Sequence, residues 1–164
     1  MKTLEPTISE TGHSIESEVP SRFYAAFYRR SQLFAVDVEL VREVLPGQPL
    51  TRVPRAVEQI IGVLNLRGEI LPVVVIDTHL GLPAVVDDPS LPILVLRRGD
   101  LLVGLRVDAV QGAISIPTGE ILSHPASGDK GHLTGLWQPE GRPPVTLIAA
   151  MKLIETFYQQ TSTN

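Results

Sequence analysis

Residues 60–76 read IIGVLNLRGEILPVVVI, so two aliphatic runs flank the short polar-ended stretch NLRG. Aliphatic runs of this length that are separated by turn-forming residues are typical of two antiparallel strands joined by a hairpin loop. We therefore predict a strand at residues 60–64, a strand at residues 70–76 and a loop between them. Leu66 and Arg67 are expected to project from the tip of this loop.

Short aliphatic runs also lie on both sides of this hairpin, and together they indicate an all-β chain. The core must be aliphatic, because hydrophobic residues make up 43% of the chain and aromatic residues only 5%, and Val and Ile favour strands. Several short strands separated by regular turns are typical of a barrel or a sandwich. Further strands are predicted at residues 23–28, 33–37, 50–53, 93–97, 101–108, 110–116 and 133–137, and an edge strand follows Pro143 and Pro144.

Helical signals are limited to three places. Apolar residues at spacings of three and four predict a helical turn within residues 38–45. Pro54 can begin a helix, so one or two further turns are predicted at residues 56–60. Helical spacing near the end of the chain predicts one amphipathic helix over residues 148–158, which we expect to cover an edge or seam of the β structure.

The length of 164 residues predicts one domain, which can consist of two lobes. Residues 1–21 are rich in Glu, Ser and Thr, so they are expected to form a disordered tail. Prolines, glycines and the acidic pair Asp87 and Asp88 mark residues 81–92 as the connection between the lobes. The domain is therefore expected at residues 22–158, with a first lobe at 22–82, a second lobe at 91–147, the terminal helix at 148–158 and a tail at 159–164.

Charge and composition argue against several classes of protein. The formal net charge is −4 and no block of Lys and Arg is present, which disfavours a nucleic-acid partner. The absence of cysteine excludes disulfides, thiolate zinc sites, iron–sulfur clusters and cysteine nucleophiles. The aliphatic runs fall far short of the roughly 20 residues of a membrane-spanning helix, and the start of the chain lacks the apolar stretch of a secretory signal. We therefore expect a cytoplasmic protein with no direct membrane insertion.

The sequence offers little catalytic or cofactor chemistry. The four histidines do not form a ligand pair such as H-x-x-x-H, and neither a G-x-S-x-G elbow nor a phosphate-binding glycine loop is present. Asp87 and Asp88 alone do not supply the roughly six oxygen ligands of Ca²⁺. We predict no catalytic residue, no metal and no cofactor. A small β-barrel hydrolase or binding module stays a remote alternative, because a convergent triad leaves no local motif.

Two single residues are candidates for a role of their own. Asp108 ends a predicted strand, where its carboxylate can accept backbone hydrogen bonds and fix a tight turn, with a contact role as the alternative. Arg67 lies between two aliphatic strands, so it is either a solvated loop tip or a displayed anchor for a partner. An exposed arginine contributes about 0–1 kcal/mol through ion pairing, whereas an arginine desolvated in an interface contributes about 2 kcal/mol or more.

Residues 61–73 resemble the signature G-V-x-N-L-R-G-x-I-x-P-V of the CheW family of chemotaxis coupling proteins. The resemblance extends over most of residues 22–154. Its supporting segments are residues 35–37, 41–44, 103–108 and 133–136. The resemblance implies two SH3-like five-stranded β-barrel subdomains around a shared hydrophobic core, with a C-terminal helix. It also implies an adaptor that is not an enzyme.

Two protein partners are implied by the resemblance. Members of the family bind the regulatory domain of the histidine kinase CheA, which is itself CheW-like, and the cytoplasmic hairpin tip of methyl-accepting chemoreceptors. The chain is thus expected in the cytoplasm, recruited to membrane-associated receptor arrays. An adaptor of a type IV pilus motility or phototaxis system is the alternative, since CheW-like proteins also occur in other chemosensory systems.

The resemblance also implies contact residues. Glu43 falls where the family engages the kinase or braces the loop that does so. Val41, Gly62, Arg67 and Val110 fall around the groove and loop of receptor coupling, and Gly62 is expected to let a receptor helix approach closely. The full set of predicted kinase-binding or receptor-binding residues is Val41, Glu43, Gly62, Asn65, Leu66, Arg67, Gly68, Asp108 and Val110.

Two further expectations concern charge. Glu43 and Arg67 carry opposite charges in the two best-matched segments, so we hypothesise an ion pair that holds the loop in its binding shape. The family often continues the Pro-Val-Val run with Asp-Leu-Arg, whereas this chain has Val75, Ile76 and Asp77. This departure is expected to alter the charge complementarity with a partner.

Overall fold

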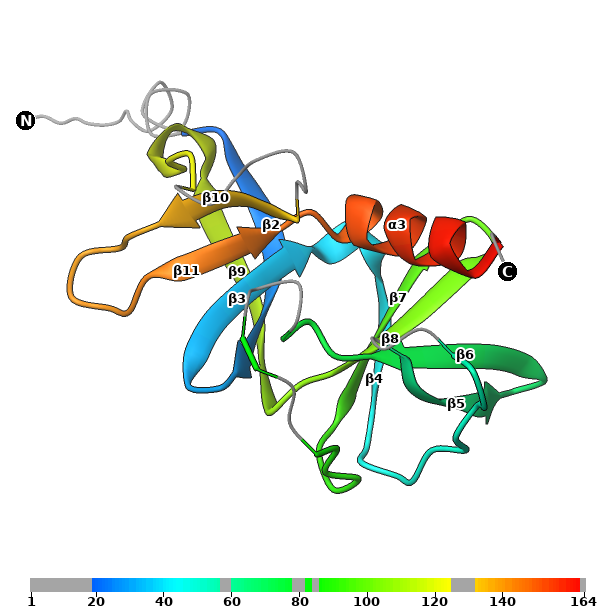
Figure 1. Cartoon of the computed structure of the whole chain (residues 1–164). Helices are drawn as coiled ribbons and strands as arrows, with labels where there is room; N and C mark the ends of the chain where they lie inside the picture. The colour runs from blue at the N-terminus through cyan, green and yellow to red at the C-terminus, as the bar shows by residue number, and fades with distance from the viewer. Residues whose placement is uncertain (1–18, 57–59, 78–81, 84–85, 125–131, 163–164) are drawn as a thin grey trace, which may run out of the picture.

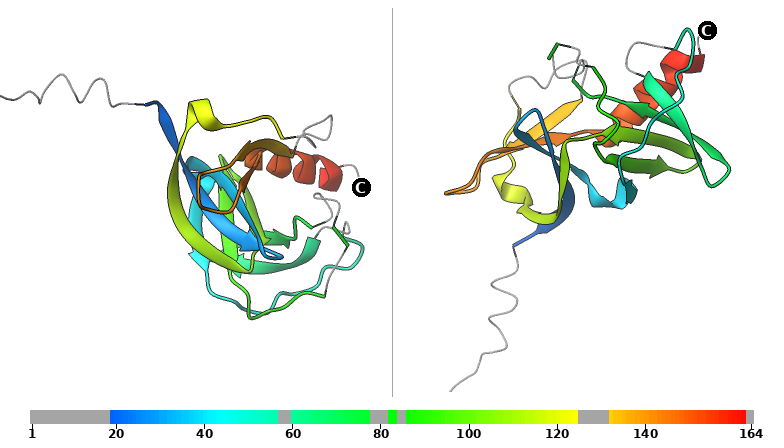
Figure 2. Two further views of the ribbon diagram at one scale, coloured as in Figure 1. Left: turned by 90° about the vertical axis from the view of Figure 1, so that its left-hand side faces the viewer. Right: turned by 90° about the horizontal axis from the view of Figure 1, so that it is seen from below.

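The computed structural model of the chain describes residues 19–56, 60–77, 82–83, 86–124 and 132–162. Within these residues the strands form two five-stranded sheets that lie side by side, with one long helix packed against them (Figures 1 and 2). Sheet I has the strand order β10-β11-β3-β2-β9, and sheet II has the order β4-β7-β8-β6-β5. The predicted all-β fold with a C-terminal helix is confirmed.

The elements have the following bounds. Sheet I consists of β2 (Ser21–Arg29), β3 (Gln32–Asp37), β9 (Ala109–Pro117), β10 (Leu133–Trp137) and β11 (Val145–Ile148). Sheet II consists of β4 (Val41–Leu45), β5 (Ile60–Leu66), β6 (Glu69–Val74), β7 (Ile93–Arg98) and β8 (Leu101–Arg106). The helical segments are the short 3₁₀ helices η1 (Val38–Leu40) and η3 (Thr118–Glu120) and the α-helix α3 (Ala150–Ser162).

Most of the predicted elements are confirmed, and three differ. The helical turn predicted within residues 38–45 is limited to η1, because Val41–Leu45 pairs with β7 as a strand. The strand predicted at residues 50–53 reduces to a single bridge from Thr51 to Val63. The predicted tail reaches the described residues only at its end, where Ser21 already begins β2. Of the turns predicted at residues 56–60, positions 57–59 lie outside the described residues.

Each sheet takes strands from both halves of the chain. Sheet I combines β2 and β3 with β9, β10 and β11, whereas sheet II combines β4, β5 and β6 with β7 and β8. The lobes expected at residues 22–82 and 91–147 therefore do not correspond to the two sheets. Hydrophobic pattern locates strands, but it carries no signal for which strands pair across the chain.

The two sheets share one topology, although no repeat is evident in the sequence. Each contains an antiparallel hairpin, β2–β3 or β7–β8, whose second strand pairs in parallel with β11 or β6. A bulged strand, β9 or β4, pairs with the first strand of each hairpin. Val110 and Val41 hold corresponding positions, because they pair with Phe27 and Leu96 beside the two bulges.

Sheet II brings its two edges together through the chain that follows β4. Thr51 bridges Val63 on the opposite edge strand, β5. Gly62 lies beneath this bridge, where a Cβ atom would be 2.6 Å from Leu50 Cβ and 3.0 Å from the Thr51 carbonyl oxygen. The missing side chain of Gly62 therefore serves a contact within the chain, rather than the approach of a partner helix.

Sheet I contains the same arrangement of a bridging segment beside a glycine. Leu122, which follows β9, bridges Leu136 of β10. A Cβ atom on the neighbouring Gly135 would lie 2.6 Å from Ile121 Cγ2. Glycine is thus required at the same place in both sheets, where a crossing segment packs directly on an edge strand.

We expect Gly62→Ala to lower the free energy of unfolding by about 1–3 kcal/mol, because the added methyl group overlaps an atom close to the backbone. Gly119→Ala is the matched control, since nothing lies within 4 Å of a Cβ atom there. That control should stay within about 1 kcal/mol of the parent protein. Urea unfolding followed by circular dichroism measures both, and equal stability of the two variants would contradict the close contact at Gly62.

The hydrophobic core consists of one cluster that both sheets share and two clusters that each belong to a single sheet. The shared cluster joins Phe27 and Phe34 of sheet I to Leu96 of sheet II, and it includes Ile154 and Phe157 of α3. Smaller clusters fill the interior of each sheet separately. The predicted packing of two subdomains around one core is therefore confirmed, and α3 covers the seam between the sheets, as expected.

Candidate functional site

The signature loop, which runs from Asn65 to Gly68, is a tight turn between β5 and β6. Leu66 pairs with Glu69 across it, so Arg67 and Gly68 are its central residues, and their φ angles are 50° and 88°. Two successive residues with positive φ are typical of a type I′ hairpin turn. Asn65 fixes the turn, because its Oδ1 atom accepts a hydrogen bond from the Gly68 amide at 2.8 Å.

Leu66 and Arg67 differ in their exposure. Leu66 is buried in the hydrophobic cluster that belongs to sheet II alone, so its predicted projection from the loop tip is wrong. Strand alternation continues to the last residue of β5 and turns this side chain inward. The Arg67 side chain is 61% exposed, which confirms its predicted projection. Ile70 of β6 is also exposed, at 63%, and was not among the predicted contact residues.

Arg67 forms the hypothesised ion pair with Glu43 of β4. Because β4 and β5 are the two edge strands of sheet II, this ion pair links the edges at the end where the signature loop lies. The existence of the pair is thereby confirmed. Its effect on the binding shape of the loop stays a prediction.

Three more charged residues extend this pair into what we call the charged row. Arg42 lies 3.6 Å from Glu43 and 3.6 Å from Glu69, measured between guanidinium nitrogens and carboxylate oxygens. Arg97 donates a hydrogen bond from Nη2 to Glu69 Oε1 at 2.9 Å. The members of the charged row are Arg42, Glu43, Arg67, Glu69 and Arg97.

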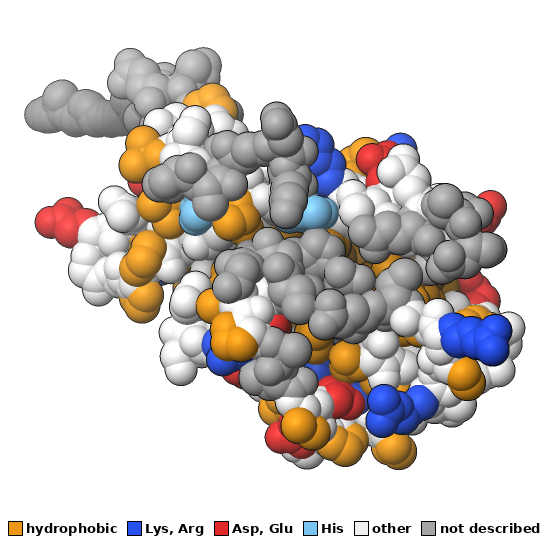
Figure 3. All heavy atoms as spheres, in the orientation of Figure 1, with side chains coloured by type: hydrophobic (Ala, Val, Ile, Leu, Met, Phe, Trp, Pro, Cys, Tyr) orange, Lys and Arg blue, Asp and Glu red, His pale blue; other side chains and the backbone are white. Residues whose placement is uncertain are grey.

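The charged row contains three arginines and two glutamates, so it carries a net positive charge. Figure 3 shows basic side chains at this end of the molecule, over β5 and β6. Such a surface suits a partner with excess negative charge. Sequence analysis missed Arg42, Glu69 and Arg97, because their pairing depends on three strands that are distant along the chain.

Val41 and Val110 lie at the seam between the sheets. Both are half-buried, and both pack against the shared core cluster. Since they hold corresponding positions on the bulged strands β4 and β9, the two sheets present the same kind of apolar position to the seam. The predicted grouping of these two valines is consistent with this arrangement.

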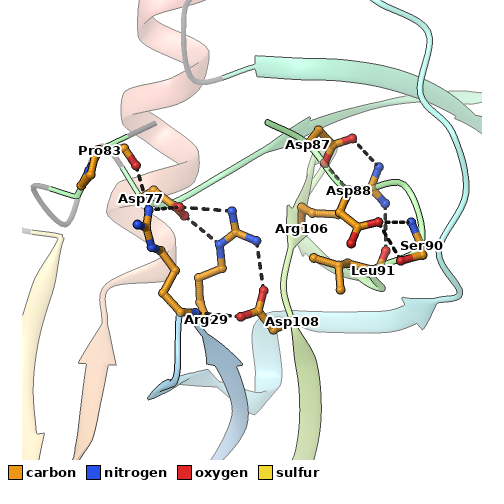
Figure 4. Close-up of polar contacts among 10 residues, drawn as sticks. Arg29, Asp77, Pro83, Asp87, Asp88, Ser90, Leu91, Arg106 and Asp108 are labelled. Atoms are coloured by element: carbon orange, nitrogen blue, oxygen red, sulfur yellow. Dashed lines mark hydrogen bonds and ion pairs between the residues drawn. The ribbon is translucent and has the colours of Figure 1, made fainter. Parts of the chain in front are cut away.

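Asp108 belongs to a buried cluster that we call the inter-sheet clamp (Figure 4). Arg29, at the end of β2, donates from Nε to Asp77 Oδ1 at 2.8 Å and from Nη2 to Asp77 Oδ2 at 3.2 Å. Arg29 Nη1 donates to Asp108 Oδ1 at 3.2 Å, and the Arg30 amide donates to Asp108 Oδ2 at 2.8 Å. Asp108 thus accepts a backbone hydrogen bond, as expected, but from the β2–β3 turn.

The Arg29–Asp77 pair of the inter-sheet clamp is shielded from solvent. The side chains of Arg29 and Asp77 are 5% and 0% exposed. Burial is the largest single influence on the pKa of Arg29 and lowers it, but the hydrogen bonds and charges of Asp77 and Asp108 outweigh burial, so the pKa is raised. Asp77 follows β6 of sheet II, and it therefore ties the sheets together. The expectation that Asp77 alters charge complementarity with a partner is wrong, because no partner can reach it.

A second buried arginine holds the connection between β6 and β7 (Figure 4). Arg106 is 1% exposed, and it donates to the two carboxylate oxygens of Asp87 at 2.9 and 3.0 Å. Asp88 accepts hydrogen bonds from the Ser90 hydroxyl and amide, and these bonds lower the pKa of Asp88. Asp87 thus anchors the connection to sheet II, and Asp88 fixes a turn within the connection.

The predicted contact residues fall into separate groups. Glu43, Asn65, Arg67 and Gly68 meet at the signature loop, Val41 and Val110 lie at the seam, Asp108 belongs to the inter-sheet clamp, and Gly62 and Leu66 are buried. In the part of the chain that the structure describes, no group of three or more His, Asp or Glu residues could hold a metal ion. No helix of that part is long and apolar enough to cross a membrane.

Two like sheets share a core, and sheet II displays an ion-paired turn, which is the architecture of a small β-sheet module. The CheW-like domain family matches residues 24–157, and the chain therefore belongs to the CheW-like family. It is an adaptor of chemotaxis signalling and not an enzyme.

Individual relatives agree with this family. The chain is 32% identical to "Chemotaxis protein CheW" of Rhizobium meliloti, over 71% of this chain and 77% of the relative. It is 33% identical to "Protein FrzA" of Myxococcus xanthus, over 86% of this chain and 96% of the relative. The crystal structure of scaffolding protein TtCheW from Thermoanaerobacter tengcongensis matches with a TM-score of 0.68 and 25% identity, and the match covers 79% of this chain and 89% of TtCheW.

Proposed function

We propose that the chain joins the cytoplasmic hairpin tip of methyl-accepting chemoreceptors to the regulatory domain of a CheA-type histidine kinase. The observation that carries this proposal is the signature loop, which displays Arg67 on a tight turn while Glu43 orients its guanidinium group. An arginine that is already oriented loses less conformational entropy when it meets a partner. The adaptor works in the cytoplasm, at membrane-associated receptor arrays.

The seam between the sheets is the proposed receptor contact. A receptor tip is a helical hairpin, and a helix docks into an apolar groove by one face. Val41 and Val110 supply apolar positions from both sheets at this seam. Glu43, with Arg42, Glu69 and Arg97 of the charged row, supplies the proposed kinase contact, where complementary charge favours rapid and selective association. Arg67 belongs to the proposed receptor contact, as the family resemblance implies.

An adaptor of another chemosensory pathway, such as type IV pilus motility or phototaxis, is the second candidate. The similarity to Protein FrzA supports this second candidate. The match covers 96% of that relative, and the relative does not carry the CheW name. Deleting the gene and scoring swimming and surface motility separately distinguishes the two outputs.

Capture of two purified partners tests the proposed function. The partners are a receptor hairpin-tip fragment and the regulatory domain of the CheA-type kinase from the same cell. We expect the chain to retain each partner separately and to bring both into one complex on size-exclusion chromatography. Retention of neither partner would refute the coupling role.

Val110→Lys is expected to weaken capture of the receptor fragment by about tenfold while capture of the kinase domain stays within about twofold, because a charge at the seam disfavours an apolar helix face. Val86→Lys is the matched control, since Val86 is 93% exposed and lies outside the seam. Circular dichroism verifies the fold of both variants. If both variants capture the receptor fragment equally well, the receptor contact does not lie at the seam.

A further inference from the structure

A small pocket opens where the β2–β3 hairpin of sheet I meets the loop between β10 and β11. Its volume is about 170 Å³. The lining residues are Tyr28, Leu33, Gln111, Ile114, Trp137, Pro139, Arg142, Pro143 and Val145. This end of sheet I lies far from the signature loop, at the opposite end of the molecule (Figure 1). The pocket therefore shares no residue with the charged row.

Leucine side chains fill the corresponding end of sheet II. Leu64, Leu71 and Leu102 hold the positions that Trp137, Val145 and Leu33 hold in sheet I. In sheet II these leucines pack with Leu66 in one buried cluster. In sheet I the position that corresponds to Leu66 is Pro139, whose smaller ring lines the pocket and leaves space for one more apolar side chain.

The size of the pocket limits what can occupy it. Sites for cofactors and other small molecules usually measure about 300–1,000 Å³, so 170 Å³ is too small for such a ligand. A single Leu or Phe side chain is of the right order. Buried anchor residues of this kind dominate the affinity of protein–protein interfaces. The occupant is thus one apolar side chain of a partner protein.

Charge at the rim specifies the residue beside that anchor. Arg142 lies over the Trp137 ring, with 5.5 Å between Cζ and the ring centroid, and Trp137 is held in place by a hydrogen bond from Nε1 to Glu120 Oε1 at 3.0 Å. A guanidinium held over an aromatic ring keeps N–H donors available for a carboxylate. Among the described residues, Arg142 has no carboxylate partner.

The loop that carries Arg142 is preorganised. Pro139, Pro143 and Pro144 restrict its backbone, and the Arg142 amide donates a hydrogen bond to the Pro139 carbonyl oxygen at 3.4 Å. A restricted loop loses little entropy when a partner binds. We propose that this pocket is an anchor site for a partner protein segment in which a Leu or Phe side chain enters the pocket and an adjacent Asp or Glu carboxylate pairs with Arg142.

The single tryptophan of the chain makes this proposal directly testable. The indole N–H of Trp137 gives one peak in a ¹H–¹⁵N correlation spectrum, and it reports binding at the pocket wall. The probes are three capped tetrapeptides that contain Asp-Leu, Asn-Leu or Asp-Ser at their centre. We expect the Asp-Leu peptide to shift this peak saturably, and the Asn-Leu and Asp-Ser peptides to bind about tenfold more weakly.

Arg142→Gln should remove the preference for Asp-Leu over Asn-Leu, because only the carboxylate contact is lost. Arg52→Gln is the matched control: Arg52 is another exposed arginine with no carboxylate partner among the described residues, and it lies outside the pocket. The control should keep the tenfold preference. An indole peak that no peptide moves, or a preference that survives in Arg142→Gln, would overturn the anchor site.

Discussion

Asp77→Ala is expected to lower the free energy of unfolding by about 3–5 kcal/mol, the largest effect of any single change considered for this chain. The substitution leaves the Arg29 guanidinium buried, with its side chain 5% exposed and its two-pronged carboxylate partner removed. Asp108 does not compensate, because it already accepts one bond from Arg29 and one from the Arg30 amide. Urea unfolding with a two-state fit measures the change.

Two control variants separate a lost ion pair from a lost side chain. Asp108→Ala should cost about 1–2 kcal/mol, because its carboxylate is 37% exposed and Arg29 keeps Asp77. The double variant Arg29→Met with Asp77→Leu should be more stable than Asp77→Ala alone, since a buried ion pair replaced by apolar residues of similar volume is often neutral. If Asp77→Ala costs less than about 1 kcal/mol, the inter-sheet clamp does not hold the sheets together.

The residues of this clamp show where prediction from the sequence ends. The strands of both hairpins follow from aliphatic runs and turn residues, which act within a few positions of one another. The contact between Arg29 and Asp77 joins positions 48 residues apart, so it depends on how sheet I and sheet II pack. A comparison with the family pattern alone suggests a surface change at Asp77, because residue type carries no information on burial.

The hairpin pattern correctly predicts the turn residues of the signature loop, but it does not predict where β5 ends. Asn65, Arg67 and Gly68 follow from the hairpin pattern, and the opposite charges of Glu43 and Arg67 are enough to suggest their ion pair. Leu66 is misplaced because the loop is shorter than the pattern indicates, so that β5 runs two residues further than predicted, through Asn65 and Leu66. The pocket beside Trp137 leaves no local signal, since its walls come from all five strands of sheet I and one loop.

Arg67→Ala is expected to weaken capture of at least one of the two partners, the receptor fragment or the kinase regulatory domain, by about 30-fold, or about 2 kcal/mol. The reason is that an oriented arginine at a displayed turn becomes desolvated in the complex. The free energy of unfolding should change by less than about 1 kcal/mol, since the pair with Glu43 is solvent-exposed in the free chain. Titration of the kinase regulatory domain and of the receptor fragment by isothermal calorimetry measures the affinities.

The charge-swapped double variant, Arg67→Glu with Glu43→Arg, decides how the ion pair acts. If the pair matters by bracing the signature loop between β4 and β5, the swap restores the bridge between the edge strands and recovers most of the affinity lost in Arg67→Ala and Glu43→Ala. No recovery would mean that the Arg67 guanidinium itself touches the partner. The Arg22–Asp37 pair in sheet I is the matched control, because its side chains are 56% and 27% exposed, close to the 61% and 26% of Arg67 and Glu43. Arg22→Ala should leave capture of both partners within about twofold, since an exposed pair outside the contact surface contributes little to binding.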